Sequence, residues 1–168
     1  MRFASIRNMD VSNGEGVGIA LFVQGCHFHC KGCFNAETWD FNGGHLWTKE
    51  IEDNFIKLAD KPYISRISIL GGEPLADENE FFVYNLMQRL KTTYPNKKIW
   101  LYTGYKWENV CKDKDSMKFK ALTSADVVVD GQFDITKQDL YNEYTVWAGS
   151  YNQRVIDVAK AKENDYNI

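Results

Sequence analysis

The chain has 168 residues, enough for one domain that buries roughly 70% of the surface of its unfolded state. Hydrophobic residues make up 44% and charged residues 26%, with only three prolines, which excludes a disordered, collagen-like or linker-dominated chain. The formal net charge of −3 gives no bulk attraction to a phosphate backbone, so we expect no nucleic acid partner.

The first residues carry no sign of a targeting or membrane segment. Residues 1–18 lack a continuous apolar stretch and include Asp10 and Glu15, so we expect no signal peptide. The apolar run at residues 19–23 is far shorter than the roughly 20 residues that a membrane-spanning helix needs. We therefore expect a cytoplasmic protein without a membrane partner.

Predicted strands alternate with predicted helices along the chain. Short apolar runs predict strands at residues 18–24, 64–70, 99–102 and 127–129, and the apolar stretch 155–158 is a candidate last strand. Apolar residues at helical spacing predict helices at residues 48–60 and 78–94 and a short one within 113–123. Residues 134–147 follow neither pattern.

The helix predicted at residues 78–94 has the clearest pattern. We expect Asp77 to be its N-cap, with Glu80 three residues later, and Pro95 lies just past its end. Its predicted buried stripe repeats every fourth residue, at Phe82, Leu86, Leu90 and Tyr94.

The spacing of the strands predicts a parallel α/β sheet. The predicted strands starting near Ile64, Lys98 and Asp126 are 34 and 28 residues apart, which is the length of a βαβ unit. Four or five such units are too few for an eight-stranded barrel. We expect one domain over residues 1–168, with the charged tail 159–168 as a candidate for disorder.

Three of the four cysteines are close together in the sequence. The pattern Cys26-x3-Cys30-x2-Cys33 directly follows a predicted strand, which brings three thiols into one short loop. A structural zinc site and a simple electron-transfer cluster each use four protein ligands. Three thiolates on a [4Fe-4S] cluster leave one iron open, and chemistry would occur there. Cys111 stands alone, and we expect it to be a small buried side chain.

A zinc site is the alternative interpretation of this loop. The fourth zinc ligand would be one of four side chains, namely His27, His29, His45 or Cys111. Histidines in such a loop more often face solvent or support the ligands.

A second motif, Gly71-Gly72-Glu73-Pro74, directly follows the strand predicted at residues 64–70. The carboxyl ends of parallel strands form the ligand-binding edge of an α/β sheet, so this turn and the cysteine loop should share one edge. Paired glycines let a ligand approach the main chain, and Glu73 could accept a hydrogen bond from an ammonium group. A tight strand-to-helix turn explains the motif equally well.

Further polar residues are predicted at the same edge. Thr103 and Tyr105 follow the third parallel strand and Asp130 follows the fourth, where they would contact a ligand or cap a turn. Asn152, Gln153 and Arg154 precede the last predicted strand and would face a cofactor or a partner, or anchor that strand.

The cysteine loop with Phe34 and the Gly71–Pro74 turn resemble the two signature motifs of the radical S-adenosylmethionine superfamily. The segments 100–105, 126–133 and 149–154 narrow the resemblance to the family that activates anaerobic, class III ribonucleoside-triphosphate reductases. The resemblance extends from about residue 13 to residue 158. It implies an incomplete, open parallel βα barrel of the radical S-adenosylmethionine type.

The resemblance also implies a set of cofactor-binding residues. Cys26, Cys30 and Cys33 would hold a [4Fe-4S] cluster whose fourth iron chelates the amino and carboxylate groups of S-adenosylmethionine. Its implied contacts with the protein lie in the cysteine loop, in the glycine turn and after two strands, at Gly32, Cys33, Phe34, Gly71, Gly72, Glu73, Thr103 and Asp130. No catalytic side chain beyond the cluster and cofactor is implied.

The implied activity is that of an oxidoreductase. Reductive cleavage of S-adenosylmethionine would give methionine and a 5′-deoxyadenosyl radical, which abstracts hydrogen from a glycine of the anaerobic reductase. The reductase is thus the implied protein partner, and a low-potential donor such as flavodoxin would supply the electron. Activation of another glycyl-radical enzyme and a zinc-stabilised, non-catalytic binding module are the alternatives.

Overall fold

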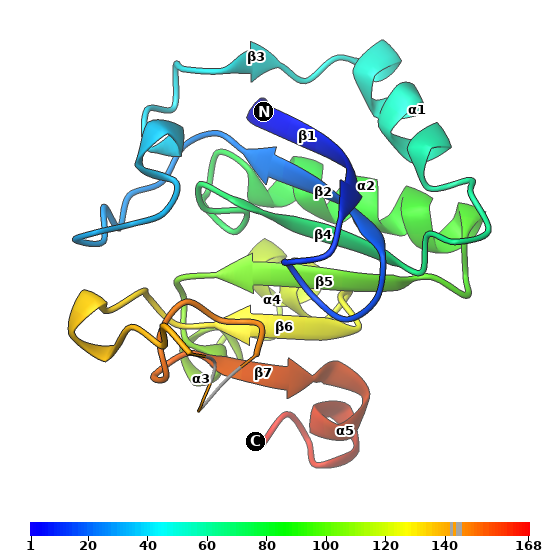
Figure 1. The fold of residues 1–168 in the computed structure, drawn as a ribbon. Helices are drawn as coiled ribbons and strands as arrows, with labels where there is room; N and C mark the ends of the chain where they lie inside the picture. The colour runs from blue at the N-terminus through cyan, green and yellow to red at the C-terminus, as the bar shows by residue number, and fades with distance from the viewer. Residues whose placement is uncertain (142, 144–145) are drawn as a thin grey trace.

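The computed structural model describes residues 1–141, 143 and 146–168, and within them a single seven-stranded sheet organises the chain (Figure 1). Its spatial order is β3-β1-β2-β4-β5-β6-β7. In chain order the strands are β1 (Arg2–Asp10), β2 (Gly18–Val23), β3 (His45–Leu46), β4 (Arg66–Gly71), β5 (Lys98–Thr103), β6 (Val127–Asp130) and β7 (Arg154–Asp157).

Five α-helices lie among the described residues: α1 (Lys49–Leu58), α2 (Glu80–Thr93), α3 (Trp107–Val110), α4 (Met117–Leu122) and α5 (Val158–Glu163). Two short 3-10 helices are η1 (Ala36–Thr38) and η2 (Ile135–Lys137). In the part of the chain that the structure describes, no helix has the length and apolar character needed to cross a bilayer.

The sheet is mixed, and this corrects the expectation of a purely parallel one. Strands β2, β4, β5 and β6 run parallel to one another, as their spacing predicted. Strand β1 pairs antiparallel with β2, and β7 pairs antiparallel with β6. The connection from β1 to β2 covers only residues 11–17, too short for a parallel crossover, which needs about a dozen residues or more.

The predicted helices are present, with different details at α2. Thr48 caps α1 through a 3.3 Å hydrogen bond from the Ile51 backbone N–H. Helix α2 begins at Glu80 after Asn79, so the predicted Asp77 cap is wrong; Asp77 pairs with Lys118 instead. Phe82, expected in the buried stripe, is 44% exposed. The buried stripe is Val83, Leu86, Met87 and Leu90.

The charged tail contains a short helix in the structure. Residues 158–163 form α5, which buries Val158 and Ala161. Asp157 caps this helix by accepting a hydrogen bond from the Lys160 backbone N–H. The Tyr166 carbonyl accepts a 2.8 Å hydrogen bond from Trp107 Nε1, so the tail packs back onto α3 despite its charged composition.

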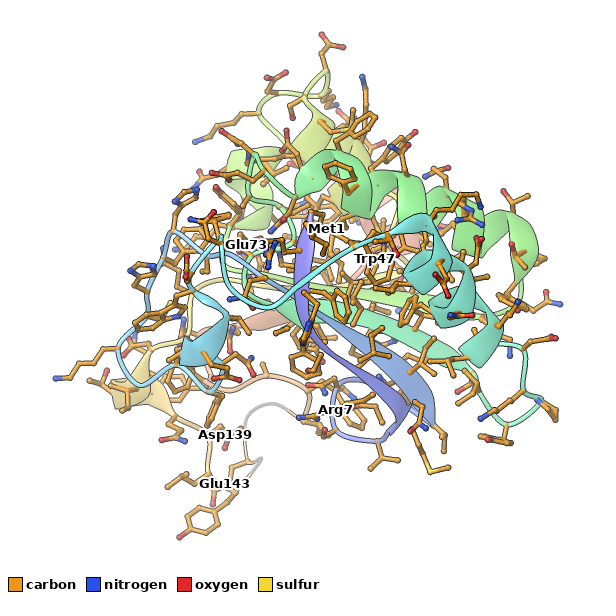
Figure 2. All side chains as sticks on the ribbon, turned by 90° about the horizontal axis from the view of Figure 1, so that it is seen from above. Met1, Arg7, Trp47, Glu73, Asp139 and Glu143 are labelled. Atoms are coloured by element: carbon orange, nitrogen blue, oxygen red, sulfur yellow. The ribbon has the colours of Figure 1, made fainter. Side chains whose placement is uncertain are left out.

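The two faces of the sheet differ in what covers them. The main core lies between the sheet and the helices, and alternating residues such as Ile19, Leu21 and Val23 point into it. Ala20, Phe22 and Leu70 point to the opposite face, where Tyr102 packs with them. Seen from above, the cyan and green helices α1 and α2 lie on one side of the strands (Figure 2). The other face is therefore free to form a pocket.

A buried arginine fixes the loop between β1 and β2. Arg66 is fully buried and pairs with the buried Asp10 carboxylate at 3.0 Å. Its guanidinium also donates to the backbone carbonyls of Asp10, Asn13, Glu15 and Gly16. Gly14 lies so close that a Cβ there would be 2.6 Å from Arg66 Cδ. The loop therefore wraps around one buried charge.

Replacing Arg66 with Met should destabilise the protein by about 3–5 kcal/mol, because it leaves the Asp10 carboxylate buried without its partner. Urea denaturation followed by circular dichroism measures this loss. The control is Arg89→Met, since Arg89 is 43% exposed in its pairs with Glu52 and Asp53 and should contribute at most about 1 kcal/mol. Equal losses in the two variants would contradict the structural role of Arg66.

Candidate functional site

A pocket of about 860 Å³ opens on the sheet face that the helices leave free. Phe22, Leu70 and Tyr102 contribute to its lining from three neighbouring strands. Its lining also includes Cys26, Cys30 and Cys33, together with the turn at Gly71, Gly72 and Glu73. The two motifs singled out in the sequence thus meet in one cavity.

Main-chain hydrogen bonds join the cysteine loop to the glycine turn. The Glu73 N–H donates to the Gly25 carbonyl at 2.7 Å, and the Gly72 N–H donates to the Val23 carbonyl at 2.9 Å. A Cβ on Gly72 would lie 2.4 Å from the Gly25 oxygen, and Gly25 itself has a φ of +97°. Glycine is therefore required on both sides of this contact.

The three clustered cysteines are free thiols, and backbone N–H groups lie near each sulfur. The Asn35 N–H donates to Cys33 Sγ at 3.4 Å. Burial raises the pKa of the Cys26 thiol, against hydrogen bonds from the Phe28 and His29 main chain that lower it. Burial likewise raises the pKa of Cys30. Such N–H donors favour the thiolate, the form that binds metal.

The other candidate metal ligands make separate contacts. His27 Nε2 lies 3.1 Å from the Glu78 carboxylate, and the His29 ring stacks on Trp39 with centroids 4.6 Å apart. His45 lies on β3 against Phe3. Cys111 ends α3, where burial raises its pKa to about 11. Among the described residues, no three His, Cys, Asp or Glu side chains gather closely enough to enclose a metal ion.

Glu73 fastens the end of β4 to the end of β5. Its carboxylate accepts hydrogen bonds from the Leu75 N–H at 2.8 Å, from Thr103 Oγ1 at 2.7 Å and from the Gly104 N–H at 2.7 Å. The side chain lines the pocket but is only 2% exposed. Burial raises the pKa of Glu73 to about 7, although these hydrogen bonds act to lower it. Thr103 lines the pocket and also holds Glu73 in place.

Asp130, for which the sequence left open contact with a ligand or capping of a turn, lies outside the residues that line the pocket. Its carboxylate is buried, and it accepts hydrogen bonds from the Trp107 N–H and from the Arg154 guanidinium. Arg154 also binds Glu108 in a bidentate pair and so anchors β7 to α3. Gln153 lines the pocket and donates to the Gly131 carbonyl, whereas Asn152 donates to the Gln132 carbonyl.

Sequence reasoning missed several residues that line the pocket. Trp39 and Tyr102 both do so, and within the described chain Trp39 Nε1 and the Tyr102 hydroxyl are buried without a hydrogen-bond partner. Phe133 also lines the pocket, and the unassigned stretch 134–147 that follows it contributes further wall residues such as Trp147. Asn142, Tyr144 and Thr145 of that stretch lie outside the described residues.

Phe34 and Gly32 lie where the cysteine loop meets the connection between β6 and β7. The Phe34 ring packs against Phe133 with centroids 4.9 Å apart and lines the pocket. A Cβ on Gly32, which has a φ of +75°, would lie 2.4 Å from the Ile135 side chain. This side of the pocket is therefore built from two segments far apart in the sequence.

The raised pKa of Glu73 predicts a pH dependence of stability. The folded state holds the proton of the Glu73 carboxyl more tightly than the unfolded state does. Protonation of Glu73 therefore contributes to the free energy of unfolding fully below pH 4.5, and this contribution is lost as the pH rises through about 7. Glu73→Gln cannot titrate, so wild type should lose stability relative to this variant between pH 5 and pH 8. Urea denaturation at both values measures the difference, and a pH-independent difference would contradict the prediction.

Comparisons with known proteins agree with this site. A family model described as a 4Fe-4S single cluster domain matches residues 12–156, a range that includes all three clustered cysteines. Several curated relatives are each called "Anaerobic ribonucleoside-triphosphate reductase-activating protein". The relative from Salmonella typhimurium is 38% identical over 157 residues, which cover 92% of this chain and 97% of the relative.

Two further relatives come from distant sources. The Vibrio cholerae protein is 39% identical over 91% of this chain and 96% of its own length. The protein of Enterobacteria phage T4 is 35% identical over 92% of this chain and 93% of its own length. With such identity over nearly the full length, this chain belongs to the family of anaerobic ribonucleoside-triphosphate reductase-activating proteins.

Proposed function

We propose that this protein activates an anaerobic ribonucleotide reductase by generating a glycyl radical in it, with a [4Fe-4S] cluster and S-adenosylmethionine as cofactors. The observation that carries the proposal is the meeting of three free thiols and the Gly71–Glu73 turn in one pocket. The relatives are named for activation of this reductase, which supports it as the protein partner.

The residues present fit an iron–sulfur cluster held by Cys26, Cys30 and Cys33. All three thiols line one pocket, and main-chain N–H groups near their sulfurs suit thiolate ligands. Trp39 Nε1 is buried in the same lining with no hydrogen-bond partner among the described residues, and a cluster sulfide would accept its hydrogen bond. Three thiol ligands leave one iron for a cofactor.

The pocket also offers contacts for S-adenosylmethionine. Gly71 and Gly72 line the pocket, where their main-chain groups would contact the cofactor, and the space that a Cβ would fill at each is taken by the backbone of β2 and of Gly25. Glu73, held by Thr103, would accept from the cofactor's amino group, and Gly32, Cys33 and Phe34 would lie near its adenine. Since Asp130 is bound to Trp107 and Arg154, it is not part of this proposal.

A cluster held by Cys26, Cys30 and Cys33 would supply the electron for reductive cleavage of S-adenosylmethionine to methionine and a 5′-deoxyadenosyl radical, and that radical would take a hydrogen atom from the partner's glycine. The chain's own task is positioning. Its residues must hold the reacting carbon within about 3–3.5 Å of the glycine and keep other hydrogen donors away. The Phe22, Leu70 and Tyr102 rings and side chains give the pocket an apolar floor on the sheet.

The fold suits a protein substrate. We interpret the sheet as an open barrel of the radical S-adenosylmethionine type, because helices cover one face and the pocket lies on the other. An open sheet would let a loop of the partner enter from the side. We also propose that residues 1–168 form a single domain and that the protein is cytoplasmic. A low-potential donor such as flavodoxin would supply the electron.

Replacing Cys30 with Ala should abolish cluster assembly and cofactor cleavage together, because one of only three protein ligands is lost. After anaerobic reconstitution, wild type should hold about four iron and four sulfide ions per chain. Release of 5′-deoxyadenosine after reduction measures cleavage. The control is Cys111→Ala, since Cys111 does not line the pocket and its loss should leave both quantities unchanged. Full cleavage by the Cys30 variant would refute its assignment as a ligand.

The decisive experiment combines the reduced protein, S-adenosylmethionine and an anaerobic ribonucleotide reductase. Electron paramagnetic resonance should then detect a glycyl radical on the reductase. Zinc without sulfide in the purified protein would favour a binding module instead. Cofactor cleavage without a glycyl radical would mean that the partner is another protein.

A further inference from the structure

Arg7 brings a positive charge to the pocket from a strand that carries none of the proposed cofactor contacts. It lies on β1 opposite Ala20 of β2, so both side chains point to the pocket face. Its guanidinium lies over the Phe22 ring, 4.6 Å from the centroid. Among the described residues lining the pocket, Arg7 is the only lysine or arginine.

The charges around Arg7 leave it largely uncompensated. Within the described part of the chain its one carboxylate contact is with Asp10 at 3.3 Å, and the Arg7 side chain is still 51% exposed. Asp10 is itself fully buried, where it pairs with Arg66 and accepts from the Asn13 backbone and side chain. Two guanidinium groups therefore share one carboxylate, which leaves one net positive charge on the pocket side.

Tyr102 adds a neutral donor to the lining of the same pocket. It packs against the cluster of Ala20, Phe22 and Leu70, on which the Arg7 guanidinium also lies, and its hydroxyl is buried with no hydrogen-bond partner among the described residues. Burial raises the pKa of this phenol, so the hydroxyl keeps its proton. An unpartnered buried donor costs free energy that an acceptor entering the pocket would recover.

We propose that Arg7 and Tyr102 form a carboxylate-binding subsite that receives an acidic side chain of the reductase segment carrying the target glycine. One guanidinium and one hydroxyl match a singly charged carboxylate, whereas a phosphate group would call for more positive charge. This inference rests on the proposed function, because it names what the same pocket recognises in its protein partner.

The position of Arg7 favours the protein partner over S-adenosylmethionine as the source of the carboxylate. The proposed cofactor contacts lie in loops beyond the ends of β2 and β4. Ala20, the neighbour of Arg7, is three residues before the end of β2 at Val23, roughly 10 Å along the strand. Figure 2 shows Arg7 well apart from Glu73, on the side of the strands away from α1 and α2.

One acidic side chain, Asp139, lies in the same pocket lining as Arg7. In Figure 2 it lies on the same side of the sheet as Arg7. Its carboxylate accepts a 2.9 Å hydrogen bond from the Glu143 backbone N–H within the connection between β6 and β7. Asp139 thus supports its own loop.

The test measures two dissociation constants of the anaerobically reconstituted protein, one for S-adenosylmethionine and one for the reductase with that cofactor present. Arg7→Met should weaken reductase binding about 10- to 100-fold and leave cofactor binding within about twofold of wild type. The affinity of Arg7→Lys for the reductase should lie between those of wild type and Arg7→Met, because lysine keeps the charge but lacks the planar guanidinium. Tyr102→Phe should raise the dissociation constant for the reductase about fivefold.

Arg89→Met is the matched control, since it removes the same charge from the helix side of the sheet and should change neither constant. Unchanged reductase binding in Arg7→Met would overturn the proposal. Weaker cofactor binding by that variant would assign the carboxylate to S-adenosylmethionine and also overturn it. Because these are binding measurements, they remain separate from the glycyl-radical assay, whose failure in wild type would reject the proposed function itself.

Discussion

One carboxylate joins the ends of two neighbouring parallel strands, and the arrangement of the pocket depends on it. Glu73 follows β4 and accepts hydrogen bonds from Thr103 and Gly104 at the end of β5. Its own N–H donates to Gly25, just beyond the end of β2. Three strand ends are thereby held at fixed distances, and the cysteine loop that grows from one of them takes its place beside the other two.

The opposite side of the pocket is fixed by a different means. Arg66 donates hydrogen bonds to four carbonyl groups and one carboxylate at the end of β1 and in the loop between β1 and β2. This loop is therefore held by a buried charge and not by regular secondary structure. Gly14 and Gly16, which precede a strand and so do not match a dinucleotide-binding motif, are explained by this wrapping. The same network orients Asp10 toward Arg7.

The parts of the fold with regular spacing could be predicted from the sequence. The four parallel strands, α1 and α2 follow from apolar periodicity, and the shared edge of the two motifs follows from parallel strand order. Strand β1 could not be predicted, because its residues are mostly polar and at the sheet margin, so they show no clear alternation. The roles of Asp130, Trp39 and Tyr102 depend on tertiary neighbours that no local pattern encodes.

The margins of the sheet have a consequence for how the protein behaves at high concentration. An unpaired strand edge can recruit another chain and start aggregation. Here the outermost strands are β3, with only two residues, and β7, with four. Strand β3 covers only Arg2 and Phe3 of β1, so most of β1 also lies at that margin, and its pairing with β2 is irregular between Phe3 and Ser5 and between Arg7 and Asp10. Bulged or very short margins are poor templates for a neighbouring strand, so an open sheet can expose its pocket without copies of the protein stacking alongside.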